Sequence, residues 1–405
     1  MRILHVVTAF PRGPEDVIVP WLVELIVRQR EAGHDVEVFT SAYRGGGNTE
    51  YRNIPLHRFR YAPARWEDLT HDEAAPDRMR RSLLYKLLPL PYVVAGMWSI
   101  WRLCRRKRYD VVHVHWPVPH ALFGWAARRG SGGQTRLVTL WYGIELRWVK
   151  SRLPWLRRFL KWALGTSDEV VAISSYTGRE IAELVHVPVR VIPYGLGFAE
   201  SLPSAPTAPS RPADGTFLIL YVGNLIPRKG VRYLIDALHQ LPPTIPAQLL
   251  ILGEGADRAK LEAQVRELGL DRRVTMPGRV PEPDLHRAFH NAKVLVLPSI
   301  VDQRGDTEGL GVVLLEALSY RIPVIGSAIG GITDIIVDGE TGLLVPPEDP
   351  AAIAKAIERI ATDPAFAKRL AETGSRRVRE RFGWDAIIAA WQECYAAALR
   401  KRPRA

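Results

Sequence analysis

The fold of this chain follows from residues 298–318, which read Pro298-Ser299-Ile300-Val301-Asp302-Gln303-Arg304-Gly305-Asp306-Thr307-Glu308-Gly309-Leu310-Gly311-Val312-Val313-Leu314-Leu315-Glu316-Ala317-Leu318. The apolar run Lys293–Leu297 just before them predicts a buried strand, and the run Val312–Leu318 has helical spacing. Glu308 therefore falls in a strand-to-helix loop at the carboxyl end of the strand. Open α/β sheets bind their ligands at that end.

The residues around Glu308 predict a ligand that carries both phosphate and hydroxyl groups. Glycine at 309 and 311 lets backbone N–H groups approach an anion at the start of the helix, where the helix dipole also favours negative charge. Glu316 lies about two turns further along and could reach back to the same ligand. Because carboxylates repel phosphate, both glutamates suit hydroxyl donors, which indicates a sugar nucleotide. The alternative is a solvated loop glutamate and a solvated helix glutamate.

A second segment, Phe217–Gly230, repeats the pattern of strand, glycine turn and helix start. Its turn holds Arg228 and Lys229, which supply a planar fork of donors and a point charge, a usual pair for binding a diphosphate. Two isolated surface cations would carry no such meaning. Their place before Glu308 and Glu316 in the chain makes the diphosphate the better interpretation.

These two segments together resemble the C-terminal half of family 4 of the retaining glycosyltransferases. The family pattern is Gly-Asn/Arg-Leu-x-x-x-Lys-Gly, then Pro-Ser-x-x-Glu-Gly-x-Gly-x-x-x-x-Glu-Ala, then a Gly-x-Pro-Val strand and a Gly-Gly turn. This chain also has Ile322-Pro323-Val324 and the turn Gly330-Gly331, with Arg321 where glycine is usual. The ordered matches cover roughly 130 residues.

The resemblance implies roles for individual residues of this chain. Arg228 and Lys229 would stabilise the charge on the leaving diphosphate, which is electrostatic catalysis that needs no metal. Glu308 would bind sugar hydroxyls near the reacting carbon, and Glu316 would bind the ribose hydroxyls. Further donor-binding positions are Gly223, Asn224, Val280, Gly309, Leu310 and Gly311. The family is thought to retain the anomeric configuration by same-face attack, so no enzyme nucleophile is expected.

The length of the chain predicts two domains, because 405 residues exceed what one hydrophobic core usually holds. Strand and helix patterns alternate in both halves, which is typical of parallel sheets with helices on both faces. The expected architecture is α/β, the GT-B fold of two Rossmann-like domains facing a cleft. Its expected parts are an acceptor domain at 1–200, a linker at 201–214 rich in proline and small residues, a donor domain at 215–375, and C-terminal helices at 376–405 that cross back to the first domain.

The composition argues against a metal site and a disulfide framework. Two cysteines are too few for such a framework and fit a reducing compartment. No Asp-x-Asp pair occurs, and the eleven histidines form no metal-ligand spacing with a cysteine. The first apolar run ends at Phe10-Pro11, so it predicts a buried strand rather than a signal peptide. We expect no cofactor beyond the nucleotide-diphosphate sugar, which is a substrate.

The N-terminal half departs from the family pattern and therefore leaves the acceptor open. Asp16–Pro20 stands where members commonly carry a Gly-Gly pair, and Trp141-Tyr142-Gly143 stands where they commonly place a histidine. His115 lies at the carboxyl end of the predicted strand Val111–His115, where the cleft should be. His115 and Tyr142 are candidate acceptor-site residues, although a histidine on an apolar face is more often a core residue.

Basic charge gathers in two acid-free segments and accounts for much of the net charge of +12. The segment Arg78–Arg108 holds nine basic residues, and Leu146–Leu164 holds six together with Trp148, Trp155 and Trp162. The uncharged stretch Leu87–Trp101 is shorter than the roughly 20 residues of a bilayer span, so it predicts a helix lying on a membrane. Interfacial tryptophan and basic side chains suit an anionic leaflet. The alternative is a solvated basic face with core-packed tryptophans.

The partners expected from these patterns are a nucleotide sugar, a lipid-linked or membrane-proximal glycan acceptor and an anionic membrane surface. We expect a cytoplasmic enzyme at the inner face of the membrane that acts in cell-envelope glycoconjugate or polysaccharide synthesis. Nucleic acid is not expected, because neither basic segment belongs to a recognition motif. Two other classes stay open: a sugar-nucleotide 2-epimerase of the same fold, and a catalytically silent membrane-bound scaffold.

Overall fold

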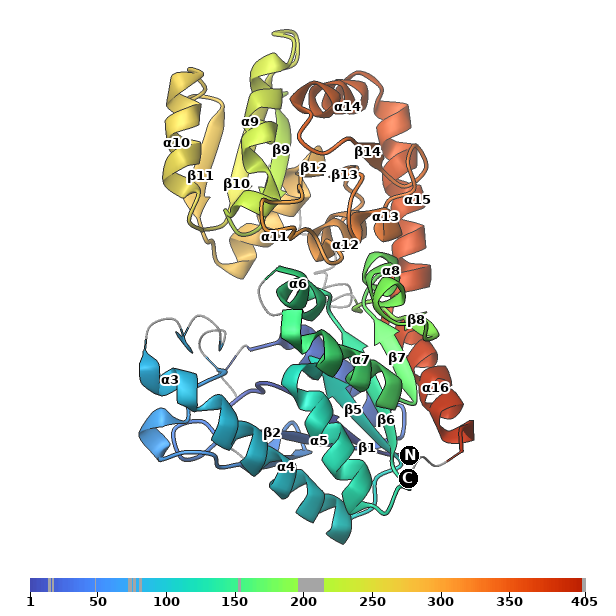
Figure 1. Ribbon diagram of the computed structural model, residues 1–405. Helices are drawn as coiled ribbons and strands as arrows, with labels where there is room; N and C mark the ends of the chain where they lie inside the picture. Colours follow the sequence, from blue (N-terminus) through green and yellow to red (C-terminus); the bar gives the residue numbers. More distant parts are fainter. Residues whose placement is uncertain are drawn as a thin grey trace. The chain divides into compact units, whose positions relative to one another are not determined.

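The computed structural model describes the whole chain except residues 14, 15, 17, 48, 72–74, 76–77, 80–81, 152–153, 196–214 and 403–405, and the side chains of 84 and 148–151. The chain forms two compact units (Figure 1). The first unit comprises Met1–Gly195 and Trp384–Ala405, and the second comprises Leu196–Gly383.

The N-terminal unit contains an eight-stranded sheet in the order β3-β4-β2-β1-β5-β6-β7-β8. All neighbouring strands pair in parallel except β3 and β4, which are antiparallel. The strand order reverses between β1 and β5, because the chain builds outward first on one side of β1 and then on the other. The strands are β1 (Arg2–Val6), β2 (Asp35–Ser41), β3 (Glu50–Tyr51), β4 (Ile54–Phe59), β5 (Val111–His115), β6 (Arg136–Trp141), β7 (Glu169–Ala172) and β8 (Val189–Val191).

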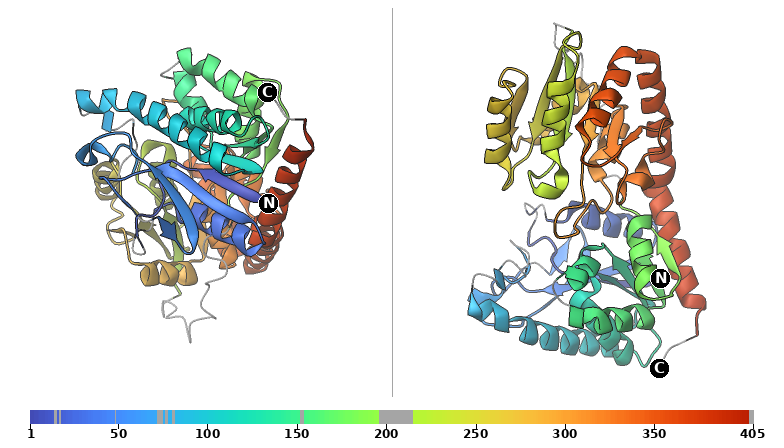
Figure 2. Two further views of the ribbon diagram at one scale, coloured as in Figure 1. Left: turned by 90° about the horizontal axis from the view of Figure 1, so that it is seen from below. Right: turned by 45° about the horizontal axis from the view of Figure 1, so that its top comes forward.

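Side chains alternate across this sheet and form a separate core on each face. Ile3 of β1 belongs to a core that includes Trp391 and Tyr395 of α16, whereas Leu4 belongs to a core that includes Tyr92 of α4. Helices α4 and α5 lie side by side (Figures 1 and 2). The helices of this unit are α1 (Pro20–Glu31), α3 (Leu83–Leu87), α4 (Pro89–Arg106), α5 (Pro117–Gly130), α6 (Ile144–Ser151), α7 (Arg157–Thr166), α8 (Ser175–Leu184) and α16 (Trp384–Arg400), with 3₁₀ turns η1 (Ala64–Trp66) and η2 (Pro154–Leu156).

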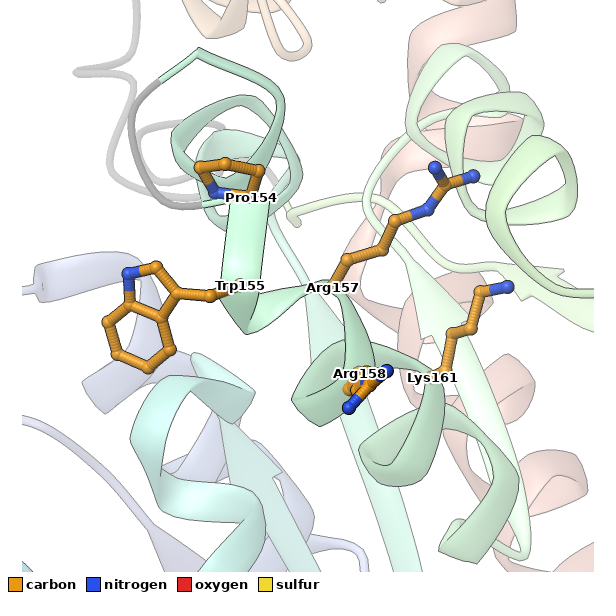
Figure 3. Close-up of a pocket in the computed structure, with 5 residues that line it drawn as sticks. All are labelled: Pro154, Trp155, Arg157, Arg158 and Lys161. Carbon is orange, nitrogen blue, oxygen red and sulfur yellow. The ribbon is translucent and has the colours of Figure 1, made fainter.

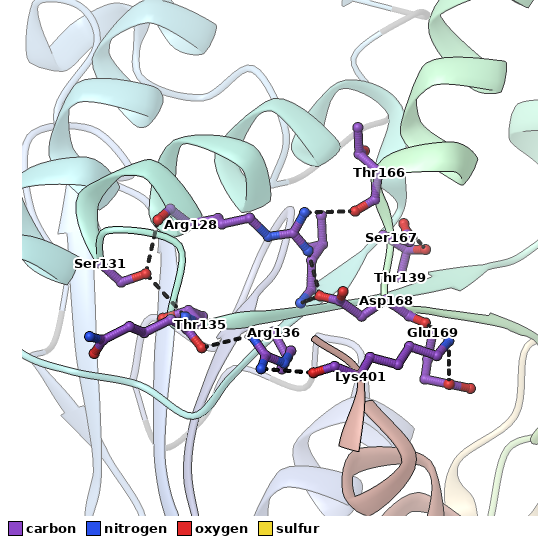
Figure 4. Close-up of polar contacts among 12 residues, drawn as sticks. Arg128, Ser131, Thr135, Arg136, Thr139, Thr166, Ser167, Asp168, Glu169 and Lys401 are labelled. Carbon is purple, nitrogen blue, oxygen red and sulfur yellow. Dashed lines mark hydrogen bonds and ion pairs between the residues drawn. The ribbon is translucent and has the colours of Figure 1, made fainter. Parts of the chain in front are cut away.

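A polar network fastens the end of the C-terminal helix to this unit (Figure 4). Arg128 of α5 forms a buried ion pair with Asp168 and donates to the carbonyl of Thr166 at 2.9 Å. Lys401, just after α16, donates to the backbone carbonyl of Asp168 and lies 2.7 Å from the carboxylate of Glu169. Arg136 donates to the carbonyl of Lys401 at 2.9 Å. Lys401 is thus bonded to the beginning of β6 and to the beginning of β7.

The C-terminal unit contains a six-stranded parallel sheet in the order β11-β10-β9-β12-β13-β14. Here the order reverses between β9 and β12, which is the Rossmann arrangement. The strands are β9 (Phe217–Val222), β10 (Ala247–Leu252), β11 (Val274–Gly278), β12 (Val294–Leu297), β13 (Val324–Ser327) and β14 (Leu343–Val345). The helices are α9 (Val231–Gln240), α10 (Arg258–Glu267), α11 (Glu282–Asn291), α12 (Val312–Ser319), α13 (Ile332–Ile335), α14 (Pro350–Thr362) and α15 (Pro364–Phe382), with the 3₁₀ turn η3 (Pro227–Lys229).

The boundary before the C-terminal crossing lies later in the chain than the sequence predicts. The prediction began the crossing helices at residue 376, but α15 runs from Pro364 to Phe382 and belongs to the second unit. The helical pattern is continuous through residue 376, so composition gave no sign of a boundary there. The break is at Gly383, and Trp384 opens α16 of the first unit. The predicted linker 201–214 lies outside the described residues.

The two basic segments form surface helices with one apolar side. Helix α4 buries Tyr92, Gly96, Ile100 and Cys104. The second segment forms two helices, because α6 ends at Ser151, before Pro154, and α7 begins at Arg157. Within the described part of the chain, no helix is both long and apolar enough to cross a membrane.

Candidate functional site: a charged cluster at the strand reversal of the C-terminal unit

The candidate donor residues lie where the strand order of the second sheet reverses. Strands β9 and β12 are neighbours, with Leu220 paired to Leu295. Arg228 and Lys229 are in η3, directly after β9, and Glu308 is in the loop between β12 and α12. Crossover helices leave adjacent central strands in opposite directions, so the loops after these strands open a crevice between them. The sequence therefore delivers its charged residues to the usual ligand position of an open α/β sheet.

Glycine allows the two loops to approach each other closely. Gly230 has φ +63°, and a Cβ built on it would lie 2.0 Å from the carbonyl oxygen of Pro298. Beside that contact, the N–H of Ile300 donates to the carbonyl of Arg228 at 2.8 Å. No side chain larger than hydrogen fits at position 230 without moving the backbone. The glycine of the Lys-Gly pair is thus required by the packing of the β9 loop on the β12 loop.

Glu308 is the centre of a compact charged cluster. Its Oε2 atom accepts a hydrogen bond from Lys229 Nζ, one from Arg228 Nη1 at 3.3 Å and one from Ser299 Oγ at 3.4 Å. Asp306 Oδ2 lies 3.6 Å from Arg228 Nε. Glu308 is only 8% exposed. Burial raises the pKa of Glu308, but the charges of Lys229 and Arg228 outweigh it and hold that pKa below its ordinary value. The carboxylate is therefore ionised at neutral pH.

The Gly330-Gly331 turn supports the backbone that carries Glu308. The N–H of Gly331 donates to the carbonyl of Glu308 at 3.0 Å. A Cβ on Gly330 would lie 2.2 Å from that carbonyl oxygen, and one on Gly331 would lie 2.1 Å from the carbonyl oxygen of Gly309. These close approaches explain why two consecutive glycines occur there.

The backbone between Glu308 and α12 presents donors suited to an anion. Among the described residues, no hydrogen bond is found from the N–H groups of Gly309, Leu310 or Gly311. Gly311 has φ +89° and immediately precedes Val312, the first residue of α12. Leu310 buries its side chain and so fixes this turn. The N–H groups and the positive end of the helix dipole together can hold a phosphate.

Glu316 lies outside the cluster of Glu308 and has a different electrostatic environment. It is half-buried in the second turn of α12. Burial raises the pKa of Glu316 to about 7, and no cation offsets the effect. The two glutamates of the motif therefore differ at neutral pH: Glu308 is charged, and Glu316 is close to half protonation.

The remaining predicted donor residues lie on neighbouring turns. Gly223 directly follows β9, and its carbonyl oxygen would be only 1.9 Å from a Cβ on Gly253. The turn after β9 and the turn after β10 are therefore in close contact. Asn224 is exposed, and its carbonyl accepts from the hydroxyl of Tyr221 at 3.1 Å. Val280 follows β11, which is two strands from β9 in the sheet order. Among the described residues no contact joins Val280 to the charged cluster, so its role stays a prediction.

Three residues of the cluster were not anticipated from the sequence. Ser299 donates a hydrogen bond to Glu308, and Asp306 forms an ion pair with Arg228. The buried Tyr221 lies close enough to Glu308 for the glutamate charge to help raise the pKa of Tyr221. Burial is the larger cause of that raised pKa, and the Glu308 charge adds to it. Ser299 could have been found, because it lies two residues after the carboxyl end of the apolar strand. Tyr221 gave no signal, because its position in β9 reads as part of a hydrophobic run.

The two acceptor candidates are core residues in this structure. His115 is fully buried, Tyr142 is 5% exposed, and His115 Nδ1 lies 2.9 Å from the Tyr142 hydroxyl. Burial is the main cause that lowers the pKa of His115 well below its ordinary value, and it raises that of Tyr142. Neither side chain is open to a ligand as placed, and a role in acceptor binding stays a prediction.

Comparisons with known proteins agree with this geometry. A family model described as Glycosyl transferases group 1 matches residues 207–377, and one described as Glycosyltransferase Family 4 matches residues 20–197. Glycogen synthase of Mycobacterium tuberculosis is 32% identical over 302 residues, which are 73% of this chain and 70% of that protein. The chain belongs to glycosyltransferase family 4.

Other members of the family and of the fold resemble this glycosyltransferase along most of its length. The GDP-mannose-dependent alpha-(1-6)-phosphatidylinositol monomannoside mannosyltransferase of Mycolicibacterium smegmatis is 30% identical over 337 residues, 80% of this chain and 86% of that protein. The structure of Anabaena HepE in complex with UDP has a TM-score of 0.72 at 19% identity, covering 98% of this chain and all of that one (100%). The predicted family and GT-B fold are thus confirmed.

The two cations should be essential for turnover. Loss of a hydrogen bond to a charged group costs about 1.5–3 kcal/mol, and charge that develops in the transition state makes the loss larger. Lys229→Ala and Arg228→Ala should each lower kcat by at least roughly a hundredfold, with unchanged circular dichroism. Arg232→Ala is the matched control, because Arg232 is an exposed cation on the next helix turn. Near-normal rates in both site variants would reject the assignment.

The two glutamates should separate in their kinetics. Glu316→Gln should chiefly raise the donor KM, and Glu308→Gln should chiefly lower kcat. Because the pKa of Glu316 is about 7, its carboxylate is fully available to hydroxyl donors only above that pH. The donor kcat/KM should therefore rise with pH through about 7, and the rise should vanish in Glu316→Gln. A pH profile that Glu316→Gln leaves unchanged would contradict this division of roles.

Proposed function

We propose that this glycosyltransferase moves a sugar from a nucleotide-diphosphate donor to a lipid-linked or membrane-proximal glycan acceptor, with retention of anomeric configuration. The observation that carries the donor half is the cluster of Lys229 and Arg228 on Glu308 beside the N–H groups of Gly309–Gly311. A neutral sugar needs no positive charge for binding, but this site combines two cations with the N-terminus of a helix. They suit a diphosphate leaving group.

The proposed donor chemistry follows from what these groups do. Lys229 and Arg228 share the Glu308 carboxylate, and a bound diphosphate would receive hydrogen bonds from the same two side chains. Glu308 then remains beside the phosphates, and its carboxylate can accept hydrogen bonds from the sugar hydroxyls. Because the cations neutralise the leaving group, we expect turnover without added metal and in the presence of EDTA.

The membrane half rests on an exposed apolar stripe of α3 and α4, which we call the α4 stripe. Its side chains recur every three or four residues and so share one side of the helices. Their exposed fractions are 77% for Leu83, 71% for Leu87, 73% for Leu90, 58% for Val94 and 57% for Trp98. Such a stripe is costly in water and favourable in the interface of a bilayer.

Positive charge continues from the α4 stripe. The guanidinium of Arg102 lies 5.3 Å from the ring of Trp98, and that of Arg105 lies 4.9 Å from the ring of Trp101. Arg102, Arg105 and Arg106 are exposed. Lys107 is different, because its ammonium is paired with the buried carboxylate of Glu37. Apolar residues followed by exposed arginines suit an anionic lipid surface.

A second surface feature of the N-terminal unit has the same chemistry (Figure 3). A pocket of about 490 Å³ is lined by Pro154, Trp155, Arg157, Arg158 and Lys161. Trp155 is 71% exposed, and its ring points away from the side to which Arg157 and Lys161 extend (Figure 3). Among the described residues, the lining has three cations and no acidic group, so it favours an anionic head group. The name of the Mycolicibacterium smegmatis relative, a mannosyltransferase of phosphatidylinositol monomannoside, supports a lipid acceptor.

A panel of nucleotide sugars tests the donor proposal. Incubation with one matching donor and an acceptor mixture should release free nucleoside diphosphate, with and without EDTA, and Lys229→Ala should abolish the release. A sugar-nucleotide 2-epimerase would instead invert carbon 2 of the sugar in the nucleotide donor without an acceptor, and a silent scaffold would release nothing. Either result would overturn the proposal, as would an activity lost in EDTA and restored by Mg²⁺ or Mn²⁺.

Vesicle sedimentation tests the membrane proposal. The protein should sediment with vesicles that contain anionic lipid, and added salt should weaken the binding, because each Lys or Arg near such a surface contributes about 1 kcal/mol that ions screen. Replacement of Arg102, Arg105 and Arg106 by Gln, or of Leu90, Val94 and Trp98 by Gln, should reduce binding.

The control carries the same number of changes in the other unit: Lys368, Arg369 and Arg376, all exposed, become Gln. Lys107 is left in place because its loss would expose the charge of Glu37 in the core. Protein that stays in the supernatant with anionic vesicles at low salt would contradict the membrane proposal and would favour a soluble glycan or small-molecule acceptor instead.

A further inference from the structure

Three histidines meet in the core of the N-terminal unit, on the two strands where its sheet order reverses. His5 belongs to β1, and His113 and His115 belong to β5. His5 pairs in register with His113, and His115 lies two residues further along the same face. All three side chains have no exposed surface. A histidine buried in an apolar core usually needs a hydrogen-bond partner for its ring nitrogens. Here three buried histidines lie next to one another.

Each histidine uses one ring nitrogen to bond outward to a polar side chain. His5 Nε2 lies 2.7 Å from Gln29 Oε1 on α1, and His113 Nδ1 lies 2.8 Å from the Tyr395 hydroxyl on α16. His115 Nδ1 lies 2.9 Å from the Tyr142 hydroxyl. Gln29 and Tyr395 also bond to each other at 2.8 Å. Metal-bound histidines characteristically use their second nitrogen in this manner, which fixes ring orientation.

The other ring nitrogens of His5 and His115 face each other. His5 Nδ1 and His115 Nε2 are 3.0 Å apart. His113 Nε2 is buried and has no hydrogen-bond partner among the described residues. One nitrogen from each ring can be chosen so that all three lie within 4.8 Å of one another. The site thus has three oriented imidazoles, one of them with a lone buried nitrogen that nothing in the described protein satisfies.

We propose that His5, His113 and His115 bind a divalent first-row transition ion of the zinc class. Imidazole nitrogens suit zinc, cobalt, nickel and copper, whereas magnesium and calcium prefer oxygen. Three nitrogens at about 2.05 Å from a tetrahedral zinc ion lie about 3.4 Å from each other. The rings of His113 and His115 are stacked, with centroids 4.1 Å apart and planes inclined by 22°, so they must rotate out of this stack to point at a common ion. The fourth position is left for water or another small ligand.

Binding requires one tautomer change and no net loss of protons. Without an ion, His5 donates from Nε2 to Gln29, so its Nδ1 accepts from His115 Nε2–H, and the Tyr142 hydroxyl donates to His115 Nδ1. With the ion bound, the proton of His115 moves from Nε2 to Nδ1, and this Nδ1–H donates a hydrogen bond to the Tyr142 hydroxyl oxygen. His113 Nε2 then has a partner, with Nδ1–H donating to Tyr395.

Such an ion would fasten the centre of the N-terminal sheet. It would join β1 to β5 directly and, through Tyr395 and Gln29, would hold α16 and α1 on the same face. This role is independent of the proposed donor chemistry, whose residues belong to the C-terminal unit. From the sequence alone we expected no metal site. The three histidines gave no metal-ligand pattern there, because His5 is separated from the other two by more than a hundred residues.

Cobalt spectroscopy of the full chain tests the site. The protein is stripped with a chelator, desalted and titrated with Co²⁺, both folded and during refolding, because the nitrogens are sealed in the core. We expect one equivalent of bound cobalt with the strong visible absorption of a tetrahedral nitrogen site, displaced by Zn²⁺. Saturating Zn²⁺ should raise the melting temperature by several degrees.

His113→Asn is the decisive variant, because its amide can replace Nδ1 toward Tyr395 but offers nothing at the place of Nε2. It should bind cobalt at least tenfold more weakly and lose the zinc-dependent shift, whereas His186→Ala, which removes an exposed histidine of the same unit, should behave as wild type. Absence of the absorption in wild type under both loading conditions would overturn the proposal. So would binding that survives in His113→Asn or disappears in His186→Ala.

Discussion

The ion pair that Glu308 makes with both Lys229 and Arg228 is the interaction on which the C-terminal unit depends. It joins the loop after β9 to the loop after β12, and so connects the two strands between which the sheet order reverses. Gly230 allows these two loops to pack closely, and Gly330 and Gly331 allow their own turn to pack against the loop that carries Glu308. Burial alone would favour a protonated Glu308, and the two cations keep it charged. In the proposed function, the same two cations bind the diphosphate of the donor.

The N-terminal unit has the same topological reversal but fills it with different chemistry. Where the C-terminal sheet offers open charged loops, the first sheet places three buried histidines on β1 and β5. Their outward nitrogens bond to α1, α16 and Tyr142, so they link the sheet to its covering helices. Duplicated architecture therefore does not imply duplicated function. One reversal serves the proposed donor, and the other forms a polar centre inside the core.

Much of the fold could be predicted from sequence, because both sheets are built from short apolar runs followed by turn residues. The strand Val111–His115 has the predicted bounds. The antiparallel β3 was missed because two residues give no periodicity. In the site, Glu308, Arg228 and Lys229 were accessible through motif spacing. The histidine cluster was not, because only the pairing of β1 with β5 brings His5 to residues so distant in the chain.

The most direct test of the account is a crystal structure of the enzyme with a nucleoside diphosphate, chosen from those released in the donor assay. The account predicts that the terminal phosphate contacts Lys229, Arg228 and the N–H groups of Gly309–Gly311, with the ribose hydroxyls at Glu316. A diphosphate bound elsewhere, with the Glu308 cluster untouched, would contradict it.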